Sequence, residues 1–268
     1  MKALPGRLVL LGHPVHHSLS PTFQNAALRS AALPLQYEAV DVDPDALDET
    51  LAGLVAAAAA GNVTIPHKER VAARCTHVTP LAARVGAVNT FWVANGELHG
   101  DNTDVGGFRE ALAATAPNVD NSAPVAVLGA GGAAAAVVVA LEQEAFVDVR
   151  IHARTHARAE ALCARFPETK PVPTLEQAVR DATLVVNATP VGLDGRTIPF
   201  DLALLEPHAV VLDLVFGRNE TPLVRAARAR GHVAADGLEM LLAQGALAFE
   251  RWFGITPDRA VMREAVAR

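Results

Sequence analysis

A glycine-rich stretch near the middle of the chain, residues 129–134, constrains the fold more than any other segment. Residues 125–128 before it are all apolar and predict a buried strand, and the alanine- and valine-rich residues after it predict a helix to about Glu144. Gly129, Gly131 and Ala134 give the spacing G-x-G-x-x-A, which lets a backbone turn tightly and approach a pyrophosphate at the helix N-terminus. The stretch therefore predicts a dinucleotide-binding α/β unit; a purely structural tight turn is the alternative.

The end of the next expected strand, residues 147–152, indicates which dinucleotide this unit prefers. A NAD-binding unit would carry Asp or Glu there to bond the ribose hydroxyls. This sequence has Arg154, Thr155 and Arg158 instead, and no acid. Because arginine grips a phosphate bidentately and stacks on adenine, these residues favour the 2′-phosphate of NADP over NAD. The alternative is that both arginines are solvated residues on a helix.

Strands alternate with helices along the rest of the chain, which predicts two α/β domains: one N-terminal with a mostly parallel sheet, and one of Rossmann type. Residues 238–252 form a helix too apolar for a surface element, so we expect the C-terminal helices to pack back on the first domain. The expected domains are residues 1–104 with 238–268, and residues 105–237. Outside the glycine-rich unit, strands are expected at 8–11, 36–42, 61–63, 89–93, 97–99, 184–190, 210–215 and 232–235.

Proline and capping residues predict where helices begin. Ser20 is expected to cap a helix that has Pro21 at its first position. Pro66 suits the first position of another helix, which places Lys68 in that helix's first turn. A lysine there is electrostatically unusual, because the positive end of the helix dipole favours anions. It indicates an anionic or hydroxylated group nearby, whereas a surface lysine in a βα loop is the ordinary alternative.

Composition argues against several classes of protein. The chain has 268 residues, of which 51% are hydrophobic, enough to bury a sizeable core. A net charge of −6 and a pI near 5.9 argue against nucleic acid or an anionic membrane surface as the main partner. Cys75 and Cys163 lie far apart with no metal-ligand spacing, which indicates neither a disulfide framework nor a zinc site and fits a reducing cytoplasm. No apolar run approaches the roughly 20 residues of a membrane span.

Three polar clusters lie at the C-terminal ends of strands or at helix starts, where open α/β sheets bind ligands. Together they offer hydroxyls, amides, one lysine and one aspartate but no metal cage, which suits a small polyhydroxylated acid. Each also has a local explanation as a helix cap, a turn residue or a surface charge. The clusters are Ser18 with Ser20; Asn62, Thr64 and Lys68; and Asn89, Asn102 and Asp104.

These motifs, taken in their order, resemble the shikimate dehydrogenase family. They span nearly the whole chain, and the ordered set is far more specific than any single member. The matching segments are Gly12-His13-Pro14 with Ser18-Leu19-Ser20-Pro21 and Asn25; residues 62–68; residues 86–90; residues 101–104 with Gly107; the turn at Gly129; Arg154-Thr155; residues 187–192; and Gly237-Leu238 with Met240 and Gln244.

The resemblance implies a cytoplasmic NADP-dependent oxidoreductase that reversibly reduces 3-dehydroshikimate to shikimate, in the chorismate route to aromatic amino acids. Lys68 and Asp104 would be the catalytic pair. A small-molecule substrate, no metal, no nucleic acid, no membrane and a monomer or homodimer are expected. The implied substrate-binding residues are Ser18, Ser20, Asn62, Thr64, Asn89 and Gln244. The implied cofactor-binding residues are Gly129, Ala130, Gly131, Gly132, Ala133, Arg154, Thr155, Arg158, Thr189, Val215 and Gly237.

Two rival functions stay open. A quinate/shikimate dehydrogenase that uses NAD is disfavoured by the missing acid near Arg154, and a catalytically silent NADP-binding paralogue is disfavoured by the presence of both Lys68 and Asp104. Five departures from the family's pattern bear mainly on cofactor affinity and the nicotinamide-side loop. They are Gln24 in place of His, Ala153 in place of Asn, Phe216 in place of Tyr, Gly217-Arg218-Asn219 in place of a proline-containing turn, and Glu239 in place of Gly.

Overall fold

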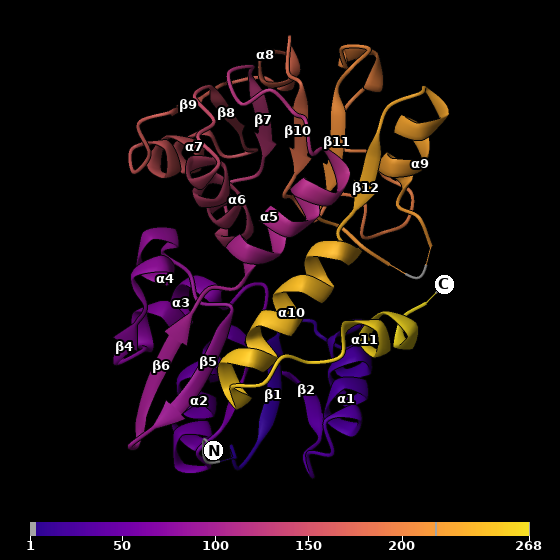
Figure 1. The fold of residues 1–268 in the computed structure, drawn as a ribbon. Helices are drawn as coiled ribbons and strands as arrows, with labels where there is room; N and C mark the ends of the chain where they lie inside the picture. The colour runs from indigo at the N-terminus through magenta and orange to yellow at the C-terminus, as the bar shows by residue number, and fades with distance from the viewer. Residues whose placement is uncertain (1–3, 218, 268) are drawn as a thin grey trace. The chain divides into compact units, whose positions relative to one another are not determined.

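The computed structural model describes residues 4–217 and 219–267, and two six-stranded sheets organise this part of the chain (Figure 1). Unit 1 comprises Met1–Gly107 and Leu241–Arg268, and unit 2 comprises Phe108–Met240. Residues 1–3, 218 and 268, which fall within the expected domain ranges, lie outside the described residues.

The sheet of unit 1 has the strand order β2-β1-β3-β5-β6-β4. Its pairings are mixed, because β5 runs antiparallel to β3 and β6 while the other three pairings are parallel. The strands expected at 89–93 and 97–99 form a hairpin, whose turn has positive φ angles of 54° at Asn95 and 77° at Gly96. The strands are β1 (Leu8–Gly12), β2 (Tyr37–Asp41), β3 (Ala60–Val63), β4 (His77–Val78), β5 (Thr90–Ala94) and β6 (Glu97–Asp101).

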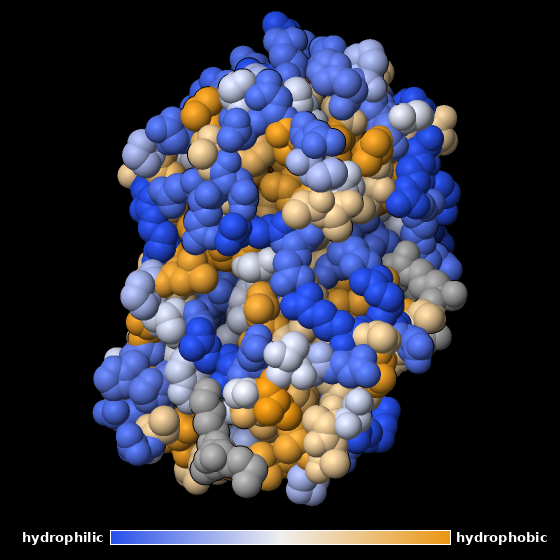
Figure 2. Space-filling model, viewed as in Figure 1, coloured by the Kyte–Doolittle hydropathy of each residue, from blue (hydrophilic) through white to orange (hydrophobic). Residues whose placement is uncertain are grey.

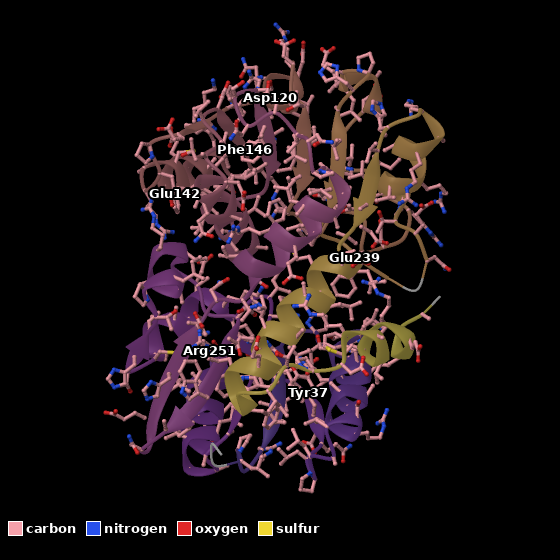
Figure 3. The ribbon with its side chains drawn as sticks, in the orientation of Figure 1. Tyr37, Asp120, Glu142, Phe146, Glu239 and Arg251 are labelled. Atoms are coloured by element: carbon pink, nitrogen blue, oxygen red, sulfur yellow. The ribbon has the colours of Figure 1, made fainter. Side chains whose placement is uncertain are left out.

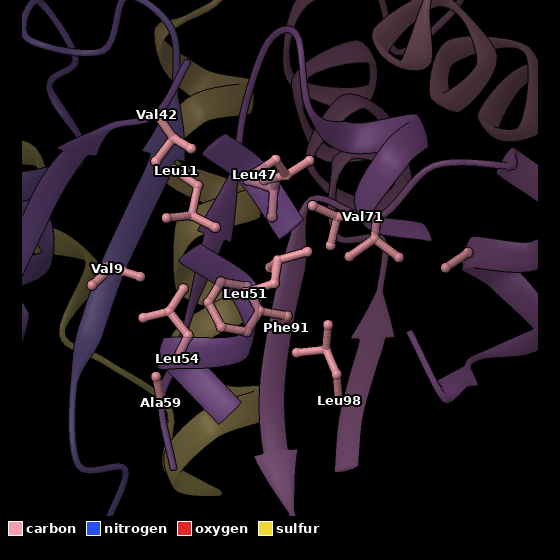
Figure 4. Packing of buried hydrophobic residues seen from close by; sticks show 13 residues of the cluster. Val9, Leu11, Val42, Leu47, Leu51, Leu54, Ala59, Val71, Phe91 and Leu98 are labelled. Carbon is pink, nitrogen blue, oxygen red and sulfur yellow. The ribbon is translucent and has the colours of Figure 1, made fainter. Parts of the chain in front are cut away.

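One face of this sheet packs on a buried apolar cluster to which α2 contributes Leu47, Leu51 and Leu54 (Figure 4). Phe91 and Leu98 point into the same cluster from β5 and β6. Because side chains alternate along a strand, their neighbours on these strands face the other side of the sheet. The helices of unit 1 are α1 (Ser20–Ser30), η1 (Pro44–Ala46), α2 (Leu47–Ala56), α3 (Lys68–Arg74), α4 (Pro80–Val85), α11 (Arg259–Ala265) and parts of α5 (Asp104–Thr115) and α10 (Leu238–Phe253).

The structure corrects the predicted starts of two helices: Ser20 does not cap α1, and Pro66 is not the first residue of α3. Ser20 is already helical, since Leu19 is the N-cap of α1 and makes no side-chain cap bond, and the Ser20 N–H donates to Ser18 Oγ at 3.2 Å. Pro66 precedes α3 instead of opening it. A turn closed by the His67 N–H to the Thr64 carbonyl, 3.0 Å, comes first, so that Lys68 is the first helical residue.

The sheet of unit 2 is entirely parallel and has the order β12-β11-β10-β7-β8-β9. Numbered from β7, this is the strand order 3-2-1-4-5-6 of a Rossmann fold, which confirms the predicted fold class. The elements are β7 (Val125–Leu128), α6 (Gly132–Gln143), β8 (Val149–His152), α7 (His156–Cys163), β9 (Thr169–Pro171), α8 (Leu175–Val179), β10 (Leu184–Asn187), η2 (Leu202–Leu204), β11 (Val210–Asp213), α9 (Pro222–Ala229) and β12 (Ala234–Asp236).

The C-terminal helices pack on unit 1, as predicted. Trp252 Nε1 of α10 donates to Thr90 Oγ1 of β5 at 3.0 Å, and Gln24 Nε2 of α1 donates to the Gly245 carbonyl of α10 at 2.9 Å. A Cβ at Gly245 would lie 2.4 Å from Phe23, so only glycine permits this approach. Figure 1 shows α11 beside α1, which agrees with their contacts.

On the face of the molecule shown in Figure 2, exposed apolar side chains are interspersed with polar ones. Of the exposed large hydrophobic residues in the described part of the chain, Ile65 is 57% exposed and Leu193 is 65% exposed. Both lie in or directly after motif segments predicted to bind ligands. Over the same residues, no helix has the length and hydropathy that crossing a membrane requires.

Candidate functional site

Two helix starts in unit 1 bring Lys68 and Asp104 together. Lys68 is the first residue of α3, Asp104 is the first residue of α5, and Lys68 Nζ lies 2.6 Å from Asp104 Oδ2. The side chains are 18% and 6% exposed, respectively. The carboxylate is favoured at a helix N-terminus and offsets the unfavourable position of the lysine at the start of another helix. The pair is thus a strongly hydrogen-bonded ion pair with limited access to water.

Asn102, and not Asp104, caps α5. Its Oδ1 accepts from the Asp104 N–H at 3.1 Å and the Val105 N–H at 3.4 Å, while its Nδ2 donates to the Ala87 carbonyl at 2.9 Å. The alternative interpretation of Asp104 as an N-cap is therefore wrong, and its carboxylate remains available to Lys68.

Asn89 holds the other oxygen of Asp104. Its Nδ2 donates to Asp104 Oδ1 at 2.7 Å and lies 3.2 Å from Gln244 Oε1, while its Oδ1 accepts from the Thr103 N–H at 2.7 Å. Asn89 is buried, so these bonds form away from water and fix the orientation of its amide. The Asp104 carboxylate therefore has a partner on each oxygen.

Asn62 extends the network toward Tyr37. The Tyr37 hydroxyl donates to Asn62 Oδ1 at 2.8 Å, and Asn62 Nδ2 donates to the Asn89 carbonyl at 3.1 Å. Burial raises the pKa of Tyr37 well above its ordinary value, which keeps the hydroxyl protonated as a donor. Tyr37, labelled in Figure 3, is a member that the sequence did not reveal, because it resembles any apolar strand residue.

Hydrogen bonds thus join five of the predicted residues, Lys68, Asp104, Asn89, Asn62 and Gln244, while the other three stand outside this network. Among the described residues, Ser18 and Thr64 are half-buried and Ser20 is buried. Thr64 directly follows β3, where its N–H donates to the Leu11 carbonyl at 2.8 Å. These three supply hydroxyl groups in unit 1 beside the elements that carry the network.

The glycine-rich turn of unit 2 fits a bound pyrophosphate. Gly129 has φ +118°, and a Cβ there would lie 2.8 Å from the Ala188 carbonyl oxygen, so the turn requires glycine. Gly131 is the N-cap of α6, and the position of its missing Cβ has no heavy atom within 4 Å. This open space adjoins the first N–H groups of α6, including those of Gly132 and Ala133, which have no intrahelical partner.

The residues after β8 fit the 2′-phosphate of NADP. Arg154, Thr155 and Arg158 are all exposed, and α7 begins only at His156, so Arg154 is not a helical residue. Thr155 is the N-cap of α7 but makes no side-chain cap bond, which leaves its hydroxyl for another partner. The chemistry of this donor set is cationic and hydroxylic, as phosphate recognition requires.

A buried carboxylate, Asp213, organises the loops at the ends of β10 and β11. It accepts from Asn187 Nδ2 at 2.8 Å, from the Thr221 hydroxyl at 2.7 Å and from the Val215 N–H at 3.1 Å. Asn187 Oδ1 in turn accepts from the Thr189 hydroxyl at 2.6 Å. The network thereby fixes two predicted cofactor residues, Thr189 and Val215, and the Gly237 N–H adds a bond to the Val215 carbonyl at 3.0 Å.

We expect Asp213→Asn to change the pH dependence of stability. Burial, opposed by its hydrogen bonds, raises the pKa of Asp213 above its ordinary 3.8. The folded state therefore binds the Asp213 proton more tightly than the unfolded state does. The stabilisation that Asp213 contributes is fully present below its pKa in the unfolded chain, and it is lost as pH rises through its pKa in the folded chain. The asparagine side chain of the variant does not titrate. Denaturant unfolding measured across a pH series should therefore show no decline in the free energy of unfolding from this position above pH 3.8.

Asp194→Asn is the matched control. Hydrogen bonds from Thr197 and the Arg196 N–H lower the pKa of Asp194 to about 2, so its contribution has the opposite sign and is lost as pH falls. If the free energy of unfolding depended on pH equally in Asp213→Asn and in the wild-type chain, the pKa of Asp213 would be the same in the folded and the unfolded state.

Three family models match the chain in succession. They are the shikimate dehydrogenase substrate binding domain over residues 10–91, shikimate/quinate 5-dehydrogenase over residues 111–192, and the shikimate 5′-dehydrogenase C-terminal domain over residues 237–267. The shikimate dehydrogenase (NADP(+)) of Mesorhizobium japonicum is 45% identical over 252 residues, which cover 92% of this chain and 90% of that protein.

Solved structures are similar over the same length. Shikimate 5-dehydrogenase from Thermus thermophilus in complex with NADP(H) and shikimate has a TM-score of 0.88 at 43% identity and covers 98% of both chains. Quinate dehydrogenase from Corynebacterium glutamicum in complex with NAD has a TM-score of 0.85 at 30% identity and covers 96% of this chain and 97% of that one.

Proposed function

Since this chain belongs to the shikimate dehydrogenase family, we propose that it catalyses the reversible NADPH-dependent reduction of 3-dehydroshikimate to shikimate. The observation that carries the proposal is the Lys68–Asp104 pair, with 2.6 Å between Nζ and Oδ2. The comparisons support the substrate and cofactor, because the relatives at this level of identity are NADP(+)-dependent shikimate dehydrogenases. A cytoplasmic monomer or homodimer stays our expectation.

Lys68 acts on the oxygen of the reacting carbonyl group. Bound NADPH supplies a hydride to that carbonyl carbon. As negative charge develops on the oxygen, the Lys68 ammonium stabilises it and donates the proton that completes the alcohol. Asp104 orients Lys68 through the ion pair, and Asn89 holds Asp104 at 2.7 Å from the other side. In the oxidative direction the same groups accept the proton from the hydroxyl.

Hydroxyl and amide groups of unit 1 position the substrate. We assign the substrate carboxylate to Ser18 and Ser20, and the ring hydroxyls to Asn62, Thr64, Asn89, Asp104 and Gln244. The buried bonds between Tyr37, Asn62 and Asn89 support this assignment, because they fix two amides before any ligand arrives. The functional domains we propose are residues 1–104 with 238–268 for substrate and residues 105–237 for cofactor.

Unit 2 holds the cofactor through its backbone and its arginines. The glycine turn from Gly129 to Ala133 takes the pyrophosphate, and Arg154, Thr155 and Arg158 take the 2′-phosphate. We assign Thr189, Val215 and Gly237 to the cofactor site, where they would contact the bound cofactor. The Asp213 network supports the last assignment, because it holds the loops that carry Thr189 and Val215.

Steady-state kinetics with two substrates and two cofactors tests the proposal. Shikimate with NADP+ should give the highest kcat/KM, and NAD+ should be about 10- to 100-fold worse, since charge-assisted hydrogen bonds to the phosphate are lost. Highest activity with quinate and NAD+ would instead show that this chain is a quinate dehydrogenase, like the Corynebacterium glutamicum relative. Absence of reduction with either substrate, in protein that binds NADP+, would identify a silent paralogue.

A further inference from the structure

Three side chains with metal-ligating chemistry meet on the outer strands of the unit 1 sheet, apart from the Lys68 network. His77 of β4 pairs in register with His99 of β6, and Glu97 lies two residues before His99 on the same strand. Residues two apart on a strand face the same side, so the sheet places all three side chains on one face. Leu98, between them, points into the apolar core on the opposite face.

The ligand atoms of this cluster lie close together. One atom each from His77, Glu97 and His99 falls within 4.8 Å of the others, and His77 Nε2 lies 3.0 Å from Glu97 Oε2. Ligands about 2.1 Å from a tetrahedral metal are separated by roughly 3.4 Å, so small side-chain rotations suffice to enclose an ion. His77 and Glu97 are exposed and His99 is half-buried, which gives an ion access from solvent.

A row of stacked rings holds His99 in place. The His77 and His99 rings stack with centroids 4.6 Å apart, and His99 stacks on Trp92 of β5 at 5.4 Å. The guanidinium of Arg251, labelled in Figure 3, lies 5.6 Å from the centroid of the Trp92 ring and 2.5 Å from Asp101. Among the described residues, His99 Nε2 is buried without a hydrogen-bond partner, which is unfavourable for a polar atom.

We propose that His77, Glu97 and His99 bind one divalent transition-metal ion of the zinc class, with a fourth position open to solvent. Two imidazole nitrogens and one carboxylate suit zinc, nickel or copper, whereas magnesium and calcium take oxygen ligands. The ion provides a partner for a histidine nitrogen and links the two-residue strand β4 to β6. Since β4 follows α3 and β6 leads to Asp104, this link ties together the segments that carry the Lys68–Asp104 pair.

Titration calorimetry of the full, untagged chain with Zn2+ tests the site. We expect saturable binding of one equivalent, and at least about tenfold weaker binding in His77→Gln and in Glu97→Gln, because each loses one ligand. The melting temperature of the wild-type chain should rise with Zn2+, while that of His77→Gln should not. Cu2+ should quench tryptophan fluorescence in the wild-type chain more than in His77→Gln, because Trp92 stacks on His99.

His156→Gln is the matched control, because His156 and Glu160 form an exposed pair 3.6 Å apart that belongs to no group of three ligating side chains within the described residues. Its affinity for Zn2+ should equal that of the wild-type chain. Three results would each overturn the proposal: no saturable Zn2+ binding, equal binding in the wild-type chain and His77→Gln, or equal binding of Mg2+ and Zn2+. None of these measurements depends on dehydrogenase activity.

Discussion

Lys68→Ala is expected to lower shikimate turnover by about 10²–10⁴-fold, the loss that follows removal of a positioned acid–base group. The side chain lies at the start of α3 with its Nζ 2.6 Å from Asp104, so removal takes away both the proton donor and the positive charge beside the reacting oxygen. Asp104 keeps its bond from Asn89, and both units should stay folded. Single-turnover rates with shikimate and NADP+ measure the effect, and circular dichroism checks the fold.

The chain offers a close control for this variant. Its three lysines are Lys2, Lys68 and Lys170, and Lys170 also forms an ion pair, 2.7 Å from Asp148. Lys170→Ala removes the ion pair between an exposed lysine and a half-buried carboxylate from unit 2 and should leave turnover unchanged. A Lys68→Ala enzyme that turned over within a few-fold of the wild-type rate would refute the catalytic assignment.

Arg154→Gln is expected to raise the KM for NADPH by about 10- to 100-fold while changing the KM for NADH little. The guanidinium is assigned to the 2′-phosphate, and hydrogen bonds between charged groups contribute about 1.5–3 kcal/mol each. Initial rates with 3-dehydroshikimate and each reduced cofactor measure the difference. Because NADH lacks the phosphate, the effect should appear in KM for one cofactor alone.

Arg180→Gln controls for the loss of an exposed arginine in unit 2. Arg180, the residue directly after α8, forms an ion pair at 3.0 Å with Glu176 of that helix. Replacing Arg180 should leave the KM values for NADPH and NADH unchanged. Equal increases for NADPH and NADH in Arg154→Gln would show that Arg154 stabilises the loop and does not read the phosphate.

The sequence allowed most of the Rossmann unit to be predicted, because its central strands are short apolar runs and its turn needs particular glycines. Two edge strands, β4 and β9, escaped prediction. They have two and three residues, and they join their sheets through backbone hydrogen bonds without an apolar pattern of their own. Such strands form only because a neighbouring strand already exists.

Site residues that belong to sequence motifs could be predicted, whereas those whose role depends on contacts with distant segments could not. Lys68 and Asp104 stand in short polar segments that resemble a family pattern. Tyr37 and Asp213, by contrast, look like ordinary strand residues, and their roles come from partners 25 residues away at Asn62 and 26 residues away at Asn187. His77 and His99 likewise meet only through strand pairing, so their spacing carried no metal signal.

The return of α10 to unit 1 sets an order of events during synthesis. Trp252, the partner of the Thr90 hydroxyl, follows it by 162 residues. At roughly 5–20 residues per second, a ribosome takes about 8–30 s to cover that distance. In this interval the ribosome makes unit 2 as one continuous segment, while the face of the unit 1 sheet that α10 covers has no partner until the end of the chain is made. All strands of the Rossmann unit are therefore synthesised before the helix that completes the unit carrying Lys68.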